Sequence, residues 1–574
     1  MMLKVSKNKT GPALGLLRST LAKNIGIIIL MSIAMLIFCP GIFLTTLNRM
    51  RFSAEEYTSP SMLNVFYGVT AVISVMLVCV SNFVNFSYLY KKSSSDIFHS
   101  LPLTRTGLLF SRMSAGIIEV LIPVTIGYIA FSALSAFYPH YIMGTFSQIA
   151  SAYFVNVLYI LASSAFSMVF IICAGSAFDL ILSFFGFNAA VLLLGGIIHA
   201  LSERYLTGYS TLNTAIFRAV SPIYYLGEKG IAFAYTYNYS LSASQGTVFA
   251  AIEFIVVFSL LSALLYNFRK AERSEQAYAY KFIYIICGIL AGICGGYALS
   301  EIFVLSADTK ELSIIGIISF ILGAVITAVV YGAVTERGFK KFKRSIILGG
   351  VSVLAYGIIA VIIATGAFGY EKRIPEEKKI VSATVDFDDA NVDFTDSKYV
   401  LALHKAIIEK GADDEYMDPL DTPHTYVRIF YYFDEKGEKQ FTREYYVDKT
   451  ILKKELFAVY ASENRFEKFN KILDNASDNR VELWGDYQED EDYKNLEGRI
   501  TKEEAKEIIT VYKRELKAVG EELYSEENQT KRAVADATLY VENKDNFHIY
   551  TTEDFTETNK ILLTFMSEAT DISE

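Results

Sequence analysis

Cysteine, histidine and tryptophan are scarce in this chain of 574 residues, and their scarcity excludes several kinds of site. All five cysteines lie inside apolar runs, so their spacing predicts neither a disulfide framework nor a zinc site. The six histidines are scattered, which argues against a metal centre. We therefore expect no metal and no cofactor.

The short motifs that identify common enzymes are also missing. No G-x-x-x-x-G-K-[ST] loop is present to hold nucleotide phosphates, so any ATP hydrolysis would have to come from a separate subunit. H-E-x-x-H, G-x-S-x-G and C-x-x-C are absent too, which argues against a membrane protease, a lipase or a redox enzyme. We expect that the chain is not an enzyme.

Long apolar runs are confined to residues 1–370, and charge divides the chain at the same place. Residues 371–574 contain 29 Lys and Arg against 48 Asp and Glu, a net charge of −19, whereas the first 370 residues have a net charge of +10. An acidic domain of this kind argues against nucleic acid or anionic lipid as a partner. The sequence predicts a membrane-embedded part followed by a soluble domain.

The apolar runs predict about nine transmembrane helices, because a bilayer core requires roughly 20 apolar residues per helix. The fold class is thus a polytopic α-helical membrane protein with a C-terminal soluble domain. The expected spans are residues 25–45, 65–88, 113–137, 150–174, 178–200, 246–267, 282–305, 313–335 and 345–369.

Basic residues predict the orientation of these spans. With the N-terminus inside, the cytoplasmic segments carry 18 Lys and Arg and the outer segments carry six. Loops rich in Lys and Arg remain in the cytoplasm, so we expect a multi-pass protein of the cytoplasmic membrane with a cytoplasmic N-terminus. Nine crossings then place the C-terminal domain outside the cell, and one miscounted span would invert it.

The cytoplasmic loop KKSSSDIFHSLPLTR, residues 91–105, is the most suggestive segment. Residues 93–96 are suited to cap a short helix, and Pro102 prevents its continuation. Ile97, Phe98 and Leu101 are spaced to form one apolar face. The pattern predicts a small amphipathic helix that docks on a partner protein, with a plain interfacial turn as the equal alternative.

A family resemblance starts from this loop. A basic helix (LLRSTLAKN), a span, an outer loop, a second span and a K-S-x-x-D-x-x-x-S-L-P-[IL]-T-R-like loop together resemble the permease subunits of ABC-2-type exporters of Gram-positive bacteria. The likeness covers residues 10 to about 270. In that family the loop is a coupling helix that contacts the ATPase subunit. The resemblance implies that the contact is formed by Ser95, Asp96, Phe98, His99, Leu101, Pro102 and Arg105.

The resemblance also implies a domain plan and partners. Residues 1–270 would be the permease core of about six spans, residues 271–370 an additional region of about three spans, and residues 371–574 an extracytoplasmic domain. The expected partners are two copies of an ABC ATPase subunit, a second permease that is identical or related, and the lipid bilayer, with no nucleic acid.

Two carboxylates fall within predicted spans, where an ionisable side chain is costly. Glu119 lies about two turns into the third span, and Glu253 lies at comparable depth in the sixth. Either is a candidate to line a translocation path. The alternative is that each is protonated, pairs across a helix interface or reaches toward the lipid headgroups.

Residues 371–574 predict an α+β domain. The patterns favour strands at 380–387, 537–542 and 547–551, and a hairpin over 425–448 around an E-K-G turn. Helical spacing occurs at 397–411, 450–474, 501–519 and 555–567. A domain of this size buries a core of its own.

The leading interpretation is the permease subunit of an ATP-binding-cassette exporter that moves a substrate across the cytoplasmic membrane. A second hypothesis is a non-transporting membrane sensor or scaffold whose outer domain binds a ligand or an envelope component. A membrane enzyme is a weaker third. The sequence does not identify the substrate.

Overall fold

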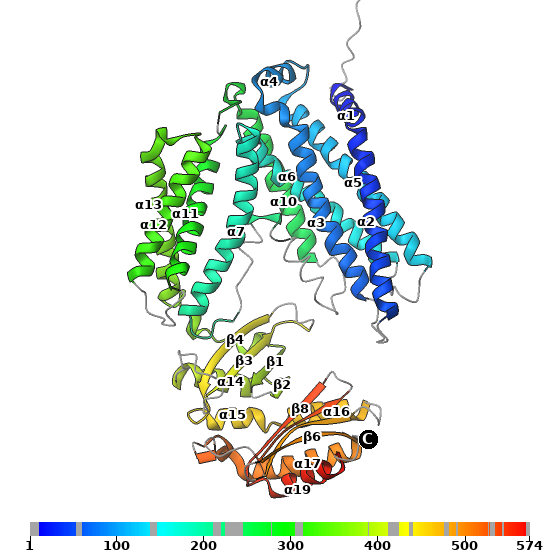
Figure 1. The fold of residues 1–574 in the computed structure, drawn as a ribbon, viewed down its shortest axis with the longest axis vertical. Helices are drawn as coiled ribbons and strands as arrows, with labels where there is room; N and C mark the ends of the chain where they lie inside the picture. Colours follow the sequence, from blue (N-terminus) through cyan, green and yellow to red (C-terminus); the bar gives the residue numbers. More distant parts are fainter. Residues whose placement is uncertain are drawn as a thin grey trace, which may run out of the picture. The chain divides into compact units, whose positions relative to one another are not determined.

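The computed structural model describes most of the chain, and Figure 1 shows its elements. The residues described are 11–52, 60–137, 146–210, 220–223, 225, 245–276, 278–304, 314–387, 390–410, 424–435, 440–475, 481–489, 492–525, 527–528, 534–541 and 545–569.

Long apolar helices make up the first part of the chain. Eight described helices are long and apolar enough to cross a membrane, and the pair α1 and α2, bent by 59°, makes a ninth. The sequence predicted about nine, which agrees with the larger count. These helices are α1 (Gly11–Lys23), α2 (Ile25–Phe52), α3 (Pro60–Asn85), α5 (Arg105–Phe137), α6 (Phe146–Cys173), α7 (Ala177–Tyr205), α10 (Gln245–Phe268), α11 (Lys281–Val304), α12 (Ile314–Thr335) and α13 (Phe342–Ala364).

Helix α5 is the central packing partner of the N-terminal helices. It contacts α1, α2, α3 and α6, and α6 packs against α3 and α10 (Figure 1). Phe66 of α3 stacks on Phe131 of α5 with ring centroids 3.8 Å apart. Because apolar attraction between helices is weak in lipid, such packing and the polar contacts described below hold the bundle together.

Helices α11, α12 and α13 follow residue 270 in the chain. Helices α11 and α12 pack closely, and Ser300 Oγ donates a hydrogen bond to the Gly316 carbonyl at 3.0 Å. Helix α11 also runs beside α7. Cys287 Sγ lies 3.8 Å from the Ser183 carbonyl, and seven residues later Cys294 Sγ lies 3.8 Å from the Ala190 carbonyl.

The described chain divides into two compact units. One contains Met1–Ile198 and Leu212–Ile359, and the other contains His199–Thr211 and Ala360–Glu574. The second unit therefore begins before residue 371, and it includes a segment at the end of α7 that the sequence boundary left out.

The C-terminal unit contains two four-stranded antiparallel sheets with the same strand order. The first sheet has the order β2-β1-β3-β4 and the second β6-β5-β7-β8. The strands are β1 (Ser382–Phe387), β2 (Ala390–Phe394), β3 (His424–Tyr432), β4 (Gln440–Asp448), β5 (Val481–Glu489), β6 (Asp492–Ile500), β7 (Ala535–Val541) and β8 (Asp545–Thr551).

Each sheet belongs to a repeat of the same design. In both, a hairpin is followed by a helix, a second hairpin and further helical structure. The helices are α14 (Lys398–Lys410), α15 (Lys453–Tyr460) and α16 (Glu463–Asn475) in the first repeat, and α17 (Lys502–Val519) and α19 (Thr556–Ala569) in the second. The unit is thus α+β, as predicted, and is built as a tandem duplication that the sequence analysis did not detect.

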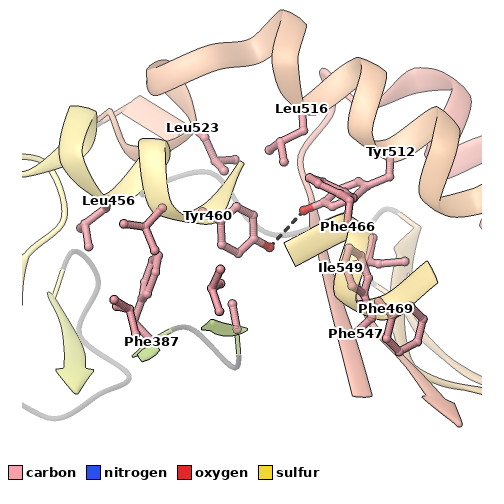
Figure 2. Packing of buried hydrophobic residues seen from close by; sticks show 14 of the residues in the cluster. Phe387, Leu456, Tyr460, Phe466, Phe469, Tyr512, Leu516, Leu523, Phe547 and Ile549 are labelled. Atoms are coloured by element: carbon pink, nitrogen blue, oxygen red, sulfur yellow. Dashed lines mark hydrogen bonds between the residues drawn. The ribbon is translucent and has the colours of Figure 1, made fainter. Parts of the chain in front are cut away.

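One continuous core joins the two repeats (Figure 2). Tyr460 of α15 and Tyr512 of α17 are fully buried, and their hydroxyl groups lie 3.0 Å apart. Phe466, Phe469 and Phe547 pack beside this pair. Because the two repeats share one core, they are expected to unfold together.

The sequence analysis missed three strands, and it predicted one helical segment where the structure has two helices. The sequences of strands β2, β5 and β6 contain acidic and amide residues between few apolar ones, which obscured the alternation of apolar residues. The helix expected over 450–474 consists of α15 and α16, separated at Ala461 and Ser462. The hairpin turn at 436–439 lies outside the described residues.

Candidate coupling helix and membrane-buried polar cluster

The short helix expected in the loop at 91–105 is present as α4 (Lys92–His99). It begins one residue earlier than predicted, with Lys91 at the N-cap and no side-chain cap. The expected cap at residues 93–96 is therefore wrong. Ser95 is instead a buried residue inside the helix, and its Oγ lies 3.2 Å from His99 Nδ1.

The apolar residues of α4 do not share one face, which corrects the second expectation. The Phe98 ring lies 4.4 Å from the Tyr88 ring, and the guanidinium of Arg112 lies 4.2 Å above it. Ile97 is 65% exposed, and Asp96 is exposed too. Adjacent helical residues point about 100° apart, so Phe98 attaches α4 to the bundle and Ile97 faces outward.

The other residues predicted for this contact lie around α4. Arg105 Nη1 donates to the carbonyls of Asn267 and Arg269, both at 2.8 Å, and thereby joins the start of α5 to the end of α10. His99 is half-buried, and burial followed by the nearby charge of Arg105 lowers its pKa. Leu101 is half-buried and Pro102 exposed in the bend before α5.

Arg269 is a buried residue close to α4 that joins three segments of the chain, and the sequence analysis missed it. It is 4% exposed, and its guanidinium donates to the carbonyls of Leu89, Ile171 and Ile172 at 3.0, 3.2 and 2.6 Å. It thus joins the segment after α3, the end of α6 and the end of α10. The available signal was a basic residue directly after an apolar run, where carbonyls at helix ends need donors.

Glu119 is buried inside the bundle, at 2% exposure, as the acceptor of three hydrogen bonds. Asn24 Nδ2 donates to its Oε1 at 2.7 Å, and Asn85 Nδ2 donates to its Oε2 at 3.0 Å. Ser81 Oγ also donates to Oε2. Asn24 lies at the bend between α1 and α2, so the carboxylate joins that bend to α3 and α5.

A second set of polar side chains continues this cluster between α3 and α6. Asn82 Nδ2 donates to Ser164 Oγ at 2.9 Å and to Ser167 Oγ at 3.2 Å. A Cβ at Gly116 would lie 2.4 Å from Asn82 Oδ1, so only glycine allows α5 to approach this closely. In lipid, such contacts bind helices together because the alternative is a polar group in hydrocarbon.

Arg112 connects the polar cluster to α4. Its Nη1 donates to the Asn85 carbonyl at 2.6 Å, while its guanidinium also lies 4.9 Å from the Tyr88 ring centroid. Asn85 in turn binds Glu119. A continuous path of contacts therefore runs from Phe98 through Arg112 and Asn85 to Glu119.

Glu253 lies elsewhere, and no contact among the described residues joins it to Glu119. It is exposed on α10, on a face that also exposes Ile252 and Val256. The two predicted translocation-path residues are therefore not brought together. The face that carries Glu253 is covered by nothing within the described chain.

The sequence contained a signal for the polar cluster that was not used. Ser74, Ser81 and Asn85 recur at helical spacing within the apolar run of α3, and Ser163 and Ser167 do so in α6. All five are buried. Polar residues repeated on one face of a transmembrane helix indicate a helix interface or a polar cavity.

The described residues contain no group of His, Cys, Asp and Glu side chains suited to hold a metal ion. Comparisons of the chain with protein-family models, with curated proteins and with solved structures found no match.

Proposed function

We propose that the chain is the permease subunit of an ATP-binding-cassette exporter, in which α4 binds the ATPase subunit. The observation that carries this proposal is the path from α4 to Glu119. A helix that presents Asp96 and Ile97 outward while Phe98 contacts Arg112 is suited to transmit movement of a docked partner into the bundle. The family resemblance of the 91–105 loop supplies the class of partner.

The permease would act with two ATPase subunits and a second permease, identical or related. The exposed face of α10 that carries Glu253 supports the presence of another chain, because a carboxylate facing lipid alone is costly. The substrate would cross between the permeases as ATP-driven closure of the ATPases moves α4.

Two features support an extracytoplasmic C-terminal domain in this proposal. Helix α7 begins close to the segment that follows Arg269, where Glu275 N donates to the Gly175 carbonyl at 2.9 Å. The last turn of α7 belongs to the C-terminal unit. Among the described residues, the four apolar helices α10–α13 separate the end of α7 from that domain, and an even number of crossings returns the chain to the same side. With α4 in the cytoplasm, as the basic residues indicate, the domain lies outside.

The test is isolation of the tagged protein from its own host membranes. We expect an ABC ATPase to co-purify, and we expect Ile97→Asp to weaken this association. Buried interface anchors contribute about 2 kcal/mol or more, which corresponds to roughly 30-fold in affinity. Ile451→Asp is the matched control, because Ile451 is an equally apolar exposed residue in the C-terminal unit.

A membrane sensor or scaffold remains the second candidate, and the exposed Trp484 on the outer face of the second sheet favours it. Exposed aromatic residues are frequent in binding surfaces. If no ATPase co-purifies and Ile97→Asp changes no association, the exporter proposal fails and this second function is preferred.

A further inference from the structure

Arg443 of β4 is fully buried within the C-terminal unit and binds two segments that are distant in sequence. Its Nη1 donates to the Gly208 carbonyl at 3.1 Å. Its Nη2 donates to the carbonyls of Tyr370 and of Arg373, the latter at 3.2 Å. Gly208 follows the end of α7, and Tyr370 and Arg373 follow the end of α13.

The same two segments also bind each other. Thr207 N donates to Glu371 Oε1 at 3.2 Å, and the rings of Tyr209 and Tyr370 lie 6.3 Å apart. The guanidinium of Arg443 lies 3.9 Å from the centroid of the Tyr370 ring. The first sheet, the segment after α7 and the segment after α13 are thus held together by these contacts. We call this group of contacts the joint.

Gly208 allows the segment after α7 to lie close to Tyr445 within this joint. Its φ is +72°, and a Cβ there would lie 2.3 Å from the Tyr445 ring. Tyr445 is itself fixed, because its hydroxyl lies 2.8 Å from His404 Nε2 in the core of the first repeat. Only glycine has both the backbone freedom and the small size that this contact needs.

The charge of Arg443 makes the joint difficult to open. Among the described residues no carboxylate forms an ion pair with this guanidinium, so the three backbone carbonyls are its hydrogen-bond acceptors. Separation of the two segments would leave a buried cation without acceptors, which is strongly unfavourable.

We propose that Arg443 is a strap that holds the C-terminal ends of α7 and α13 together, so that the C-terminal domain moves as one body with both helix ends. Helix α7 belongs to the core of six spans and α13 to the additional three. Any event that reorients the domain is therefore transmitted to both groups of helices, whether or not the chain exports a substrate.

The test uses the full chain without its native cysteines. Thr207→Cys and Glu371→Cys are introduced together, and a protease site is inserted within residues 230–240. After treatment with a short bis-maleimide, cleavage and denaturing electrophoresis, the two fragments remain joined only if the ends were linked. We expect efficient linkage with Arg443 present and at least a fivefold loss with Arg443→Ala.

Arg428→Ala is the matched control, because Arg428 lies on the neighbouring strand β3 but pairs with Glu444, at 3.0 Å, and has no hydrogen bond or ion pair to either helix-end segment among the described residues. Linkage in this variant is expected to equal that of the parent. Fluorescence of Trp484, the single tryptophan, reports whether the domain remains folded.

Gly208→Ala separates loss of the strap from loss of the fold. It drives a Cβ against Tyr445 but leaves every residue of the sheet unchanged, so it is expected to reduce linkage while Trp484 still reports a cooperative transition. Linkage that stays at the parental level in both Arg443→Ala and Gly208→Ala would overturn the proposal.

Discussion

The two carboxylates of the predicted spans have different surroundings, although the sequence placed them at similar depth. Glu119 accepts hydrogen bonds from Asn24, Ser81 and Asn85, so both of its carboxyl oxygens have partners inside the protein. Glu253 is exposed on α10 and has no such donors among the described residues. Three donors from two elements, the bend between α1 and α2 and helix α3, join both of these elements to Glu119 of α5.

We expect Glu119→Gln to destabilise the membrane part, because its amide nitrogen would face the side chains that donate to the carboxylate. Hydrogen bonds to charged groups contribute about 1.5–3 kcal/mol each in proteins, and less inside membranes. Glu253→Gln is the matched control and should have little effect. The measurement is the fraction of detergent-solubilised protein that remains monodisperse after heating. Equal losses in both variants would contradict this role of Glu119.

His404 is buried in the first repeat between two tyrosine hydroxyl groups. Its Nδ1 lies 2.9 Å from the Tyr431 hydroxyl and its Nε2 lies 2.8 Å from that of Tyr445. Burial, aided by the charge of Arg443, lowers the pKa of His404 from 6.5 to about 3. The histidine is therefore neutral in the folded unit at physiological pH.

We expect the C-terminal unit to lose stability as the pH falls from about 6.5 toward 3. In this window the unfolded state binds a proton that the folded state does not, so unfolding becomes more favourable by up to about 1.4 kcal/mol per pH unit. The measurement is the midpoint of the Trp484 transition against pH. His404→Gln should flatten this dependence, and an unchanged slope in that variant would assign it to other groups.

At the scale of elements, α4 depends on its neighbours, because a helix of eight residues is not stable alone. It is held by the contact of Phe98 with Tyr88 and Arg112 and by the bond from Lys92 N to Glu275 at 3.3 Å. Ile97 takes no part in these contacts and is exposed.

Phe98→Ala is therefore expected to loosen α4, whereas Ile97→Ala is not. Hydrogen exchange of the amides of residues 95–99 measures this directly, and we expect at least tenfold faster exchange in Phe98→Ala. This corresponds to about 1.4 kcal/mol of local stability. If both variants exchange at the parental rate, Phe98 does not anchor the helix.

The elements also show what sequence patterns reveal. The helices of the membrane part were predicted because a span must be apolar along its whole length. Strands β3 and β4 were predicted from aromatic and β-branched residues, whereas β5 and β6 were not, because acidic residues alternate with few apolar ones. In α4, sequence spacing located the helix but not the side of it that faces the bundle.

At the scale of the whole molecule, the C-terminal domain depends on chain outside residues 376–574. All three carbonyls that bind Arg443 precede residue 376. In the isolated fragment the buried guanidinium would have none of these acceptors.

We expect Arg443→Met to stabilise the isolated fragment 376–574 and to destabilise the full chain. An apolar side chain of similar length removes an uncompensated buried charge in the first case, and it removes three hydrogen bonds in the second. The Trp484 transition measures both. A change of the same sign in both contexts would show that the α7 segment does not complete this core.

The orientation that we propose for the molecule predicts which cysteines react in intact cells. In a cysteine-free background, Lys405→Cys on α14 should react with an impermeant maleimide and Ser93→Cys on α4 should not; both positions are exposed. The positive-inside rule and the even crossing number between α7 and the domain are the physical reasons. Reaction at Ser93→Cys alone would invert the topology.

The sequence by itself determined the division into apolar spans and an acidic α+β domain, because hydrophobicity and charge are properties of local segments. It also located the two carboxylates within the predicted spans and the short helix α4. Tertiary structure alone decided that, within the described chain, Glu119 has three donors and Glu253 none, that Phe98 faces inward, and that two repeats share one core. The bonds from Arg443 to Gly208 and Tyr370 also belong to this group, since they join residues up to 235 positions apart. Such partners are selected by how helices and sheets pack, and no local pattern contains that information.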